Sequence, residues 1–446
     1  MIKDILPSAM FEKLQMAKES ILENKYIKIV VHFDGDGTSS AVILCNMMKR
    51  IGKEFHLTYI KDLSMNGFME AINDGIFTII ADAGSDQLKY ASERSNIIVL
   101  DHHFYEKTAT AGLNINARDF GFNGTTEACG ATMSYAMALV MDENNKDLFP
   151  FFIAGLISDK QDLGGISGLN KILVDSYGKD FRSVHTLNLE GQTLVDALTY
   201  STDPFFKNIT GFPDKASNFL KDTGLDPEEK ITELNEDEKR LLMNSLAIKL
   251  LEQGVGIEAL RYLESDIYIF DEINFTSKEL ASIIDGNGKM GSNSVPVVYF
   301  LGHREYEAEM TNNWKMFKTK LIDYTYRSLK EIFETENVSY FYAPESEMSG
   351  AISGILMLYL ANQKKPIIGF NVGGDNTKVS GRGTRKQVQN GLNLSIVMKE
   401  ASTRVGGTGG GHDIAAGAVI PKGREMQFLE AADEIIAAQL SVRKVS

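Results

Sequence analysis

The sequence predicts an α/β protein of two or three domains, with a mainly parallel sheet in its N-terminal part. Short runs rich in Val and Ile alternate with helix-like stretches over residues 27–160, and strands that alternate with helices form parallel, covered sheets. The chain has 446 residues, which is more than one compact domain usually holds. Polar residues close several of the apolar runs, at the edge where open α/β sheets bind ligands.

The composition indicates a cytoplasmic protein without a membrane-spanning helix. Hydrophobic residues make up 43% of the chain and charged residues 24%, as in ordinary globular proteins, and no apolar run is long enough to span a bilayer. The start of the sequence lacks the apolar stretch of a signal peptide. Cys45 and Cys129 form no CxxC pair, so neither a zinc knuckle nor a disulfide framework is predicted. The net charge of −14 argues against a broadly basic surface, although carboxylates that hold metal ions contribute to it.

The first predicted domain covers residues 1–164. A helix is expected over 39–52, after a Gly-rich loop. Four strands are expected, at 27–32, 55–60, 77–82 and 96–101.

Two further regions follow. Residues 165–292 are expected to form a helical connector or inserted domain, in which Asn235 and Glu238 form a capping box. Residues 293–446 are expected to form a smaller α/β domain. It would include a long helix around 304–332 that bridges the two α/β lobes, and a final helix at 423–441. Strands are expected there at 295–302, 338–343 and 366–372.

The segment His32-Phe33-Asp34-Gly35-Asp36-Gly37 follows the first strand. Alternate residues of an extended segment point the same way, so His32, Asp34 and Asp36 are expected to face one cavity. Imidazole and carboxylate ligands suit Mn²⁺ or Mg²⁺ better than thiolate-binding metals. The alternative is a polar strand-to-helix turn with an Asp cap.

Further ionisable residues lie at the ends of the next strands. Asp82 ends one apolar run and is either a ligand or a helix cap. Asp101, His102 and His103 directly follow another run, where three adjacent ionisable groups would be poorly solvated without a metal or an anion. Asp159 follows a predicted helix. The ordered set predicts a two-metal site.

These motifs resemble those of the DHH superfamily of phosphoesterases. VSGRGTR (379–385) and the Gly-rich segment 405–421 resemble the DHHA1 domain of its nuclease and phosphodiesterase branch, and residues 200–211 and 279–291 resemble archaeal RecJ-like proteins, including the GINS-associated nuclease. The resemblance implies an active-site cleft between the two lobes. It also implies two divalent ions, with Mn²⁺ expected and Mg²⁺ or Co²⁺ as alternatives.

The resemblance assigns a role to each motif residue. His32 and Asp34 would bind one ion, Asp36, His102 and Asp159 the other, and Asp82 would bridge the two. Asp101 would orient a histidine, and His103 would face the substrate phosphate. In the C-terminal domain the strand end would be held by Ser380, Arg382, Gly409, Gly410, Gly411 and His412; by itself the Gly-rich segment could equally be a flexible turn.

The expected function is a single-strand exonuclease acting on DNA, RNA or both, in replication or repair. A phosphodiesterase for short oligonucleotides or cyclic dinucleotides is the enzymatic alternative. A replisome scaffold that binds GINS or other replication proteins is the alternative of another class. The metal ligands alone would also allow a pyrophosphatase, and the SGRG and GGGH motifs argue for nucleic-acid ends instead.

Overall fold

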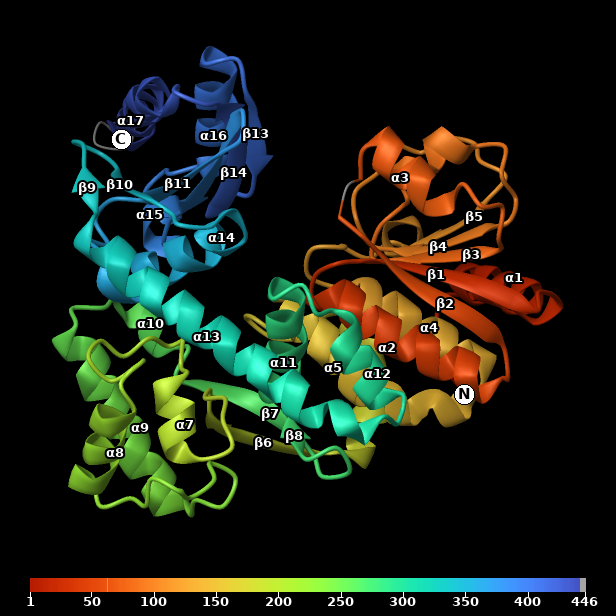
Figure 1. Cartoon of the computed structure of the whole chain (residues 1–446), viewed down its shortest axis with the longest axis horizontal. Coiled ribbons are helices and arrows are strands. Elements are labelled where there is room, and N and C mark those ends of the chain that lie inside the picture. Colours follow the sequence, from red (N-terminus) through yellow and green to blue (C-terminus); the bar gives the residue numbers. More distant parts are fainter. Residues whose placement is uncertain (62, 442–446) are drawn as a thin grey trace. The chain divides into compact units, whose positions relative to one another are not determined.

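A computed structural model describes residues 1–61 and 63–441, and it divides the chain into two compact units (Figure 1). Unit 1 contains Met1–Val184 and Ile267–Phe317, and unit 2 contains His185–Asp266 and the chain from Lys318 onward. The range 165–292, expected as one middle region, is therefore shared between the units. The last residues, 442–446, lie outside the described part.

A five-stranded parallel sheet forms the centre of unit 1. Its strand order is β2-β1-β3-β4-β5, and every neighbouring pair is parallel. The four predicted strands are confirmed, and a fifth that was not predicted lies at the edge. The strands are β1 (Tyr26–His32), β2 (Glu54–Ile60), β3 (Thr78–Ala81), β4 (Ile97–Asp101) and β5 (Leu113–Asn116).

Helices cover both faces of this sheet, which explains why most residues of its central strands are apolar. Val30, Ile80 and Val99 pack toward α3 (Met65–Ile72) in one core. The other face is covered by α2 (Gly35–Arg50) and α4 (Gly130–Met141), with α1 (Ser8–Glu23) and α5 (Phe149–Ser158) beside them (Figure 1). The helix α6 (Gly168–Tyr177) follows.

Two helices from the later part of the chain complete unit 1. Helix α11 (Ser277–Lys289) packs on α2 and α5, and α12 (Ser294–Phe300) packs on α2. The prediction of a strand at 295–302 is therefore wrong, because these residues begin as a helix. Packing against α2 outweighs the strand propensity of the β-branched residues in this segment. Pro296 is tolerated because it lies in the first turn of the helix, where its missing N–H breaks no helical hydrogen bond.

The part of unit 2 that precedes residue 267 is mainly helical. Its helices are α7 (Leu194–Thr199), α8 (Pro213–Asp222), α9 (Glu236–Glu252) and α10 (Ile257–Leu260). The predicted capping box is confirmed, since the Asn235 side chain accepts from the Glu238 N–H and the Glu238 carboxylate accepts from the Asn235 N–H. The range 165–292, expected as a helical connector or inserted domain, also holds strands. A small sheet runs in the order β6 (Arg182–Leu187), β7 (Glu264–Phe270), β8 (Phe275–Thr276), and β8 belongs to unit 1.

The C-terminal part of unit 2 is built on a mixed six-stranded sheet of order β13-β14-β12-β11-β10-β9, in which only the described pair β10–β11 is parallel. The long helix α13 (Glu307–Lys330) begins in unit 1 and ends in unit 2. The strands are β9 (Phe333–Glu334), β10 (Ser339–Tyr342), β11 (Ile367–Gly373), β12 (Asn376–Arg382), β13 (Thr408–Gly411) and β14 (Ala415–Pro421). The remaining helices are α14 (Ser346–Ile355) with a π-helical turn at Leu356–Leu360, α15 (Arg385–Gln389), α16 (Leu394–Arg404) and α17 (Glu425–Ser441).

Within the described residues, no helix combines the length and the apolar character that crossing a membrane requires.

Candidate metal centre

The first motif lies where β1 ends and α2 begins. Asp34 is the N-cap of α2 and accepts a hydrogen bond from the Gly37 N–H at 3.0 Å, while its other oxygen lies 2.8 Å from His32 Nδ1. Asp36 already lies in the first turn of the helix. The expectation that His32, Asp34 and Asp36 alternate along an extended segment is therefore wrong for Asp36. The helical turn directs Asp36 to a different group of residues.

Asp82 follows β3 and lies at the centre of the cluster. Its side chain is 2% exposed, with Oδ1 3.1 Å from His102 Nε2 and Oδ2 3.6 Å from His32 Nδ1. Oδ2 is buried and accepts no hydrogen bond within 3.5 Å from any described residue. Asp82 does not cap a helix, because the next helical turn begins only at Gln87, after Asp86. A buried carboxylate oxygen without a donor suits a cation.

The side chains of the Asp101-His102-His103 triplet differ in their contacts: Asp101 holds the neighbouring histidines, and the two histidines belong to the ligand cluster. Asp101 accepts hydrogen bonds from the backbone N–H groups of Ser85, His102 and His103 and lies 2.9 Å from His103 Nδ1. His102 is buried, with Nδ1 2.5 Å from the Gly124 carbonyl oxygen. His103 is 55% exposed. The structure thus places Asp101 as a support for its histidines.

The ligand-type atoms fall into three overlapping groups, within which they lie no more than 4.8 Å apart. Asp82 belongs to two of them and brings the first motif and the DHH triplet together. The groups are His32 with Asp34 and Asp82, Asp36 with His102 and Asp159, and Asp82 with His102 and His103. Nitrogen and carboxylate donors in this arrangement could hold divalent ions such as Mn²⁺.

The electrostatics of the cluster also fit cations. Burial, then the charges of Asp36 and Asp34, raise the pKa of Asp82 well above its usual value. Burial and the charge of Asp36 raise the pKa of Asp159 to about 7. Burial opposes the charged form of His32, but the hydrogen bond to Asp34 and the nearby negative charge of Asp82 outweigh it and raise its pKa to about 10. The cluster therefore holds protons that metal ions would replace.

Sequence reasoning missed the residues that orient the carboxylates. The Asp36 oxygens accept from the Gly130 and Ala131 N–H groups, at 2.6 and 2.8 Å, at the N-terminus of α4, where the helix dipole favours an anion. A Cβ on Gly130 would lie 2.3 Å from the Cβ of Asp82, so only glycine allows this approach. The segment ACGATMS looks like an ordinary apolar helix, and its role depends on the tertiary fold.

A chain of buried amides holds Asp159, which was also not predicted. Gln161 Nε2 donates to Asp159 at 2.6 Å. Asn170 donates to the Gln161 side-chain oxygen at 2.7 Å, and the Thr132 hydroxyl donates to Asn170 at 2.6 Å. This chain fixes the Gln161 amide with its donor toward Asp159.

Two lysines lie near the ring of Phe33, which belongs to the first motif. Lys61 Nζ is 4.8 Å and Lys289 Nζ 5.9 Å from the centre of the Phe33 ring, and Lys289 lies 3.9 Å from Asp285. Asp285 in turn lies close to the backbone of Gly35. The segment 279–291 thus contributes charged residues next to the candidate metal loop.

In unit 2 the sheet brings the other two motifs together. β14 lies between β12 and β13, so that Gly417 pairs with Ser380 on one side and with Gly410 on the other. Arg382 pairs with Ala415 in register, and the His412 N–H donates to the Ala415 carbonyl oxygen. Burial lowers the pKa of the Arg382 guanidinium. Among the described residues, no carboxylate lies within ion-pair distance of it.

Comparisons with known proteins identify the two parts of the chain. The DHH family, N-terminal domain, matches residues 26–158, and the DHHA1 domain matches residues 337–438. An uncharacterized protein of Methanocaldococcus jannaschii is 32% identical, over 96% of this chain and 98% of the relative. The chain belongs to the DHH family.

Solved structures with this fold come from several kinds of DHH protein. RecJ of Thermus thermophilus in complex with Mn²⁺ is 15% identical with a TM-score of 0.59, and the match covers 97% of this chain and 55% of RecJ. CDC45 of Entamoeba histolytica is 12% identical with a TM-score of 0.60, over 96% of this chain and 99% of CDC45. The predicted fold class, an α/β DHH domain with a parallel sheet followed by a DHHA1 domain, is confirmed.

Metal binding to this DHH protein should release protons at pH 7. A cation at His32 displaces a proton from a group whose pKa is about 10, and one at Asp159 displaces part of a proton from a group whose pKa is about 7. Because protons compete with the metal, affinity for Mn²⁺ should fall as the pH drops below about 10, where His32 takes up its proton, and more steeply below about 7, where Asp159 also does. Calorimetric titration in two buffers of different ionisation enthalpy measures the release, with His303→Ala as a control outside the cluster. Heats that do not depend on the buffer would contradict the assignment.

Gln161→Leu should weaken metal binding without unfolding the protein. The substitution removes the donor to Asp159 and leaves Asn170 without its acceptor, and loss of such a supporting residue typically costs about 10–100-fold in metal affinity. Competition with a fluorescent chelator measures the affinity. Gln427→Leu, at an exposed position of unit 2, is the matched control and should bind metal like the wild type. Equal affinity of the two variants would show that the amide chain does not position a ligand.

Proposed function

We propose that this chain is a metal-dependent exonuclease that hydrolyses phosphodiester bonds from an end of single-stranded DNA or RNA. The fold is that of the DHH-family phosphoesterases. The observation that carries the proposal is that Asp82 belongs to two ligand groups, one with His32 and Asp34 and one with His102 and His103, while His102 also belongs to the group of Asp36 and Asp159. A shared carboxylate is what a two-metal phosphoesterase needs, since both ions must act on one phosphate.

Six residues would hold two divalent ions, with Mn²⁺ expected and Mg²⁺ or Co²⁺ as alternatives: His32, Asp34, Asp36, Asp82, His102 and Asp159. When bound, the ions would supply a water of lowered pKa and would stabilise the charge that develops on the phosphate. His103 would contact the substrate phosphate, because its side chain is exposed while Asp101 fixes its ring. Lys61 and Lys289 beside Phe33 would attract the polyanion.

The DHHA1 residues would bind the end of the strand. Arg382 suits this role, since its guanidinium is partly buried and has no carboxylate partner among the described residues, and arginine binds phosphate in a bidentate manner. Ser380 and the row Gly409–Gly411 would add hydroxyl and backbone contacts in the neighbouring strands. His412 is exposed and would contact phosphate or sugar.

The direct test is digestion of a labelled single strand with Mn²⁺. Matched DNA and RNA strands carry the label at the 5′ or the 3′ end, so that polarity and sugar preference are measured together. The wild type should shorten the strand stepwise. Asp82→Asn should lose more activity than the about 10–100-fold typical of a supporting residue, because it removes the charge shared by both ions. Arg382→Ala should raise KM more than it lowers kcat and should leave metal content unchanged.

Two outcomes would overturn this assignment. A wild type that leaves every strand intact, as Asp82→Asn does, would exclude the nuclease. A strong preference for two- to five-nucleotide or cyclic substrates over long strands would establish the phosphodiesterase alternative.

A partner-binding role in replication is a second candidate, and the surface of α9 favours it. Leu242, Leu246 and Leu250 of this helix are buried, whereas Leu241, Ile248 and Leu251 are about half exposed on another face. An apolar stripe on the outer face of a helix is a common protein-binding feature. GINS or another replication protein is the expected partner. The structural likeness to CDC45 extends to the fold alone.

Substitutions on this stripe separate partner binding from catalysis. Leu241→Glu with Ile248→Glu should abolish co-purification with replication proteins and leave strand digestion at the wild-type rate. Asp36→Ala should do the opposite. Co-purification that survives both stripe substitutions would rule out α9 as the docking surface.

A further inference from the structure

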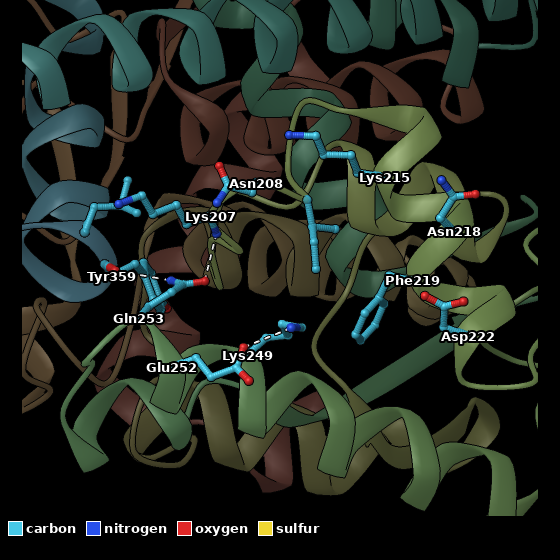
Figure 2. Close-up of a pocket in the computed structure, with 12 residues that line it drawn as sticks. Lys207, Asn208, Lys215, Asn218, Phe219, Asp222, Lys249, Glu252, Gln253 and Tyr359 are labelled. Carbon is cyan, nitrogen blue, oxygen red and sulfur yellow. Dashed lines mark hydrogen bonds and ion pairs between the residues drawn. The ribbon is translucent and has the colours of Figure 1, made fainter.

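Unit 2 contains a polar cavity of about 600 Å³, which the proposed hydrolysis does not use. Its walls are one face of α8, the C-terminal end of α9, the turn Lys207–Ile209 and the residues Tyr359 and Leu360 (Figure 2). Pockets that hold small ligands have about 300–1,000 Å³, so this one has room for a mononucleotide.

Helix α8 presents a whole face to the cavity. Lys215, Asn218, Phe219 and Asp222 are spaced i, i+3, i+4 and i+7 along the helix, so they form one stripe. Ala216 and Leu220 lie on the opposite side and are fully buried. The residues of the stripe are therefore held by a helix whose other face is anchored in the core.

The floor of the cavity is fixed by Gln253. Its side-chain oxygen accepts from the Lys207 N–H at 2.8 Å, and its amide donates to the Phe205 carbonyl at 3.1 Å and the Tyr359 carbonyl at 3.3 Å. Figure 2 shows the bonds from Gln253, at the end of α9, to Lys207 and to Tyr359. Gln253 therefore serves the structure and offers little to a ligand, while it holds Lys207 at the rim.

Some charged side chains of the cavity have an ion-pair partner and others do not. Lys249 pairs with Glu252 at 2.9 Å, so these two neutralise each other. Lys215 Nζ lies 4.4 Å from the centre of the Phe212 ring. The side chains of Lys207, Asn208, Asn218 and Asp222 form no hydrogen bond or ion pair with another described residue. In a chain whose net charge is −14, two lysines without an acidic partner at one cavity favour an anion.

We propose that this cavity binds a nucleotide, either free or as one unit of a nucleic-acid strand. Its phosphate would lie at Lys207 and Lys215, and its base would stack on Phe219, which Figure 2 shows across the cavity from Lys207. Asn218 and Asp222 would contact the edge of the base. A carboxylate only accepts hydrogen bonds, so Asp222 favours guanine, whose N1–H and N2–H groups both donate. Inorganic phosphate alone would leave Phe219 and Asp222 unused.

Calorimetric titration of the full chain with GMP, AMP, inorganic phosphate and a short single-stranded oligonucleotide tests the site. EDTA and the substitution Asp82→Asn keep the metal centre silent. GMP should bind saturably and more tightly than AMP, and phosphate more weakly than either. Lys215→Glu and Phe219→Ala should each weaken GMP binding by about tenfold or more, and Asp222→Asn should remove the preference for GMP over AMP.

Lys221→Glu is the matched control, because Lys221 lies on α8 outside the cavity. It should bind GMP like the parent protein. Equal loss of binding in Lys215→Glu and Lys221→Glu would show that only the net charge of the protein matters, and it would overturn the proposal. The absence of saturable GMP binding would also overturn it. Tighter binding of the oligonucleotide, with the same loss in Phe219→Ala, would assign the site to a nucleotide within a strand. Neither result depends on hydrolysis, so failure here leaves the proposed nuclease untouched, and the reverse also holds.

Discussion

Buried negative charge around Asp82 is the constraint on which the rest of unit 1 depends. Asp34, Asp36 and Asp159 lie with Asp82 at one edge of the sheet, and burial in a low-dielectric interior penalises each ionised carboxylate. Without cations the cluster keeps protons, as the raised pKa values of Asp82, His32 and Asp159 show. Divalent ions held by these residues would relieve the same repulsion with all four carboxylates ionised, and they would supply the charge stabilisation that phosphate chemistry needs.

The surrounding fold supplies what this cluster needs. Parallel strands bring their carboxyl ends to one edge, which places Asp82 and the DHH triplet side by side. The N-terminus of α4 then neutralises part of the charge of Asp36 through two backbone N–H groups. The amide chain through Gln161 restrains Asp159. These supports cost no further buried charge, because they use backbone and amide dipoles.

Much of the fold and the membership of the cluster could be predicted from the sequence. Apolar runs that end in His32, Asp82 and Asp101 identify both the strands and the edge where they meet. The division of the cluster into groups was implied by the family resemblance and not by the strand pattern, because it depends on α2 starting at Gly35 and turning Asp36 away from Asp34. The same applies to Gly130 and Gln161, whose contacts exist only after distant segments pack. Residues 295–302 show the limit of propensity, since packing on α2 makes a helix of a β-branched run.

The two units divide the proposed work between chemistry and binding. Unit 1 carries the carboxylates, and unit 2 carries Arg382 and the glycine row on adjacent strands of its sheet. Asp82 would be the residue common to both ion sites. Electron paramagnetic resonance of the protein loaded with two equivalents of Mn²⁺ tests this most directly. The wild type should give the spectrum of an exchange-coupled Mn²⁺ pair, which Asp82→Asn should remove; a wild-type spectrum of isolated Mn²⁺ ions only would contradict the shared site.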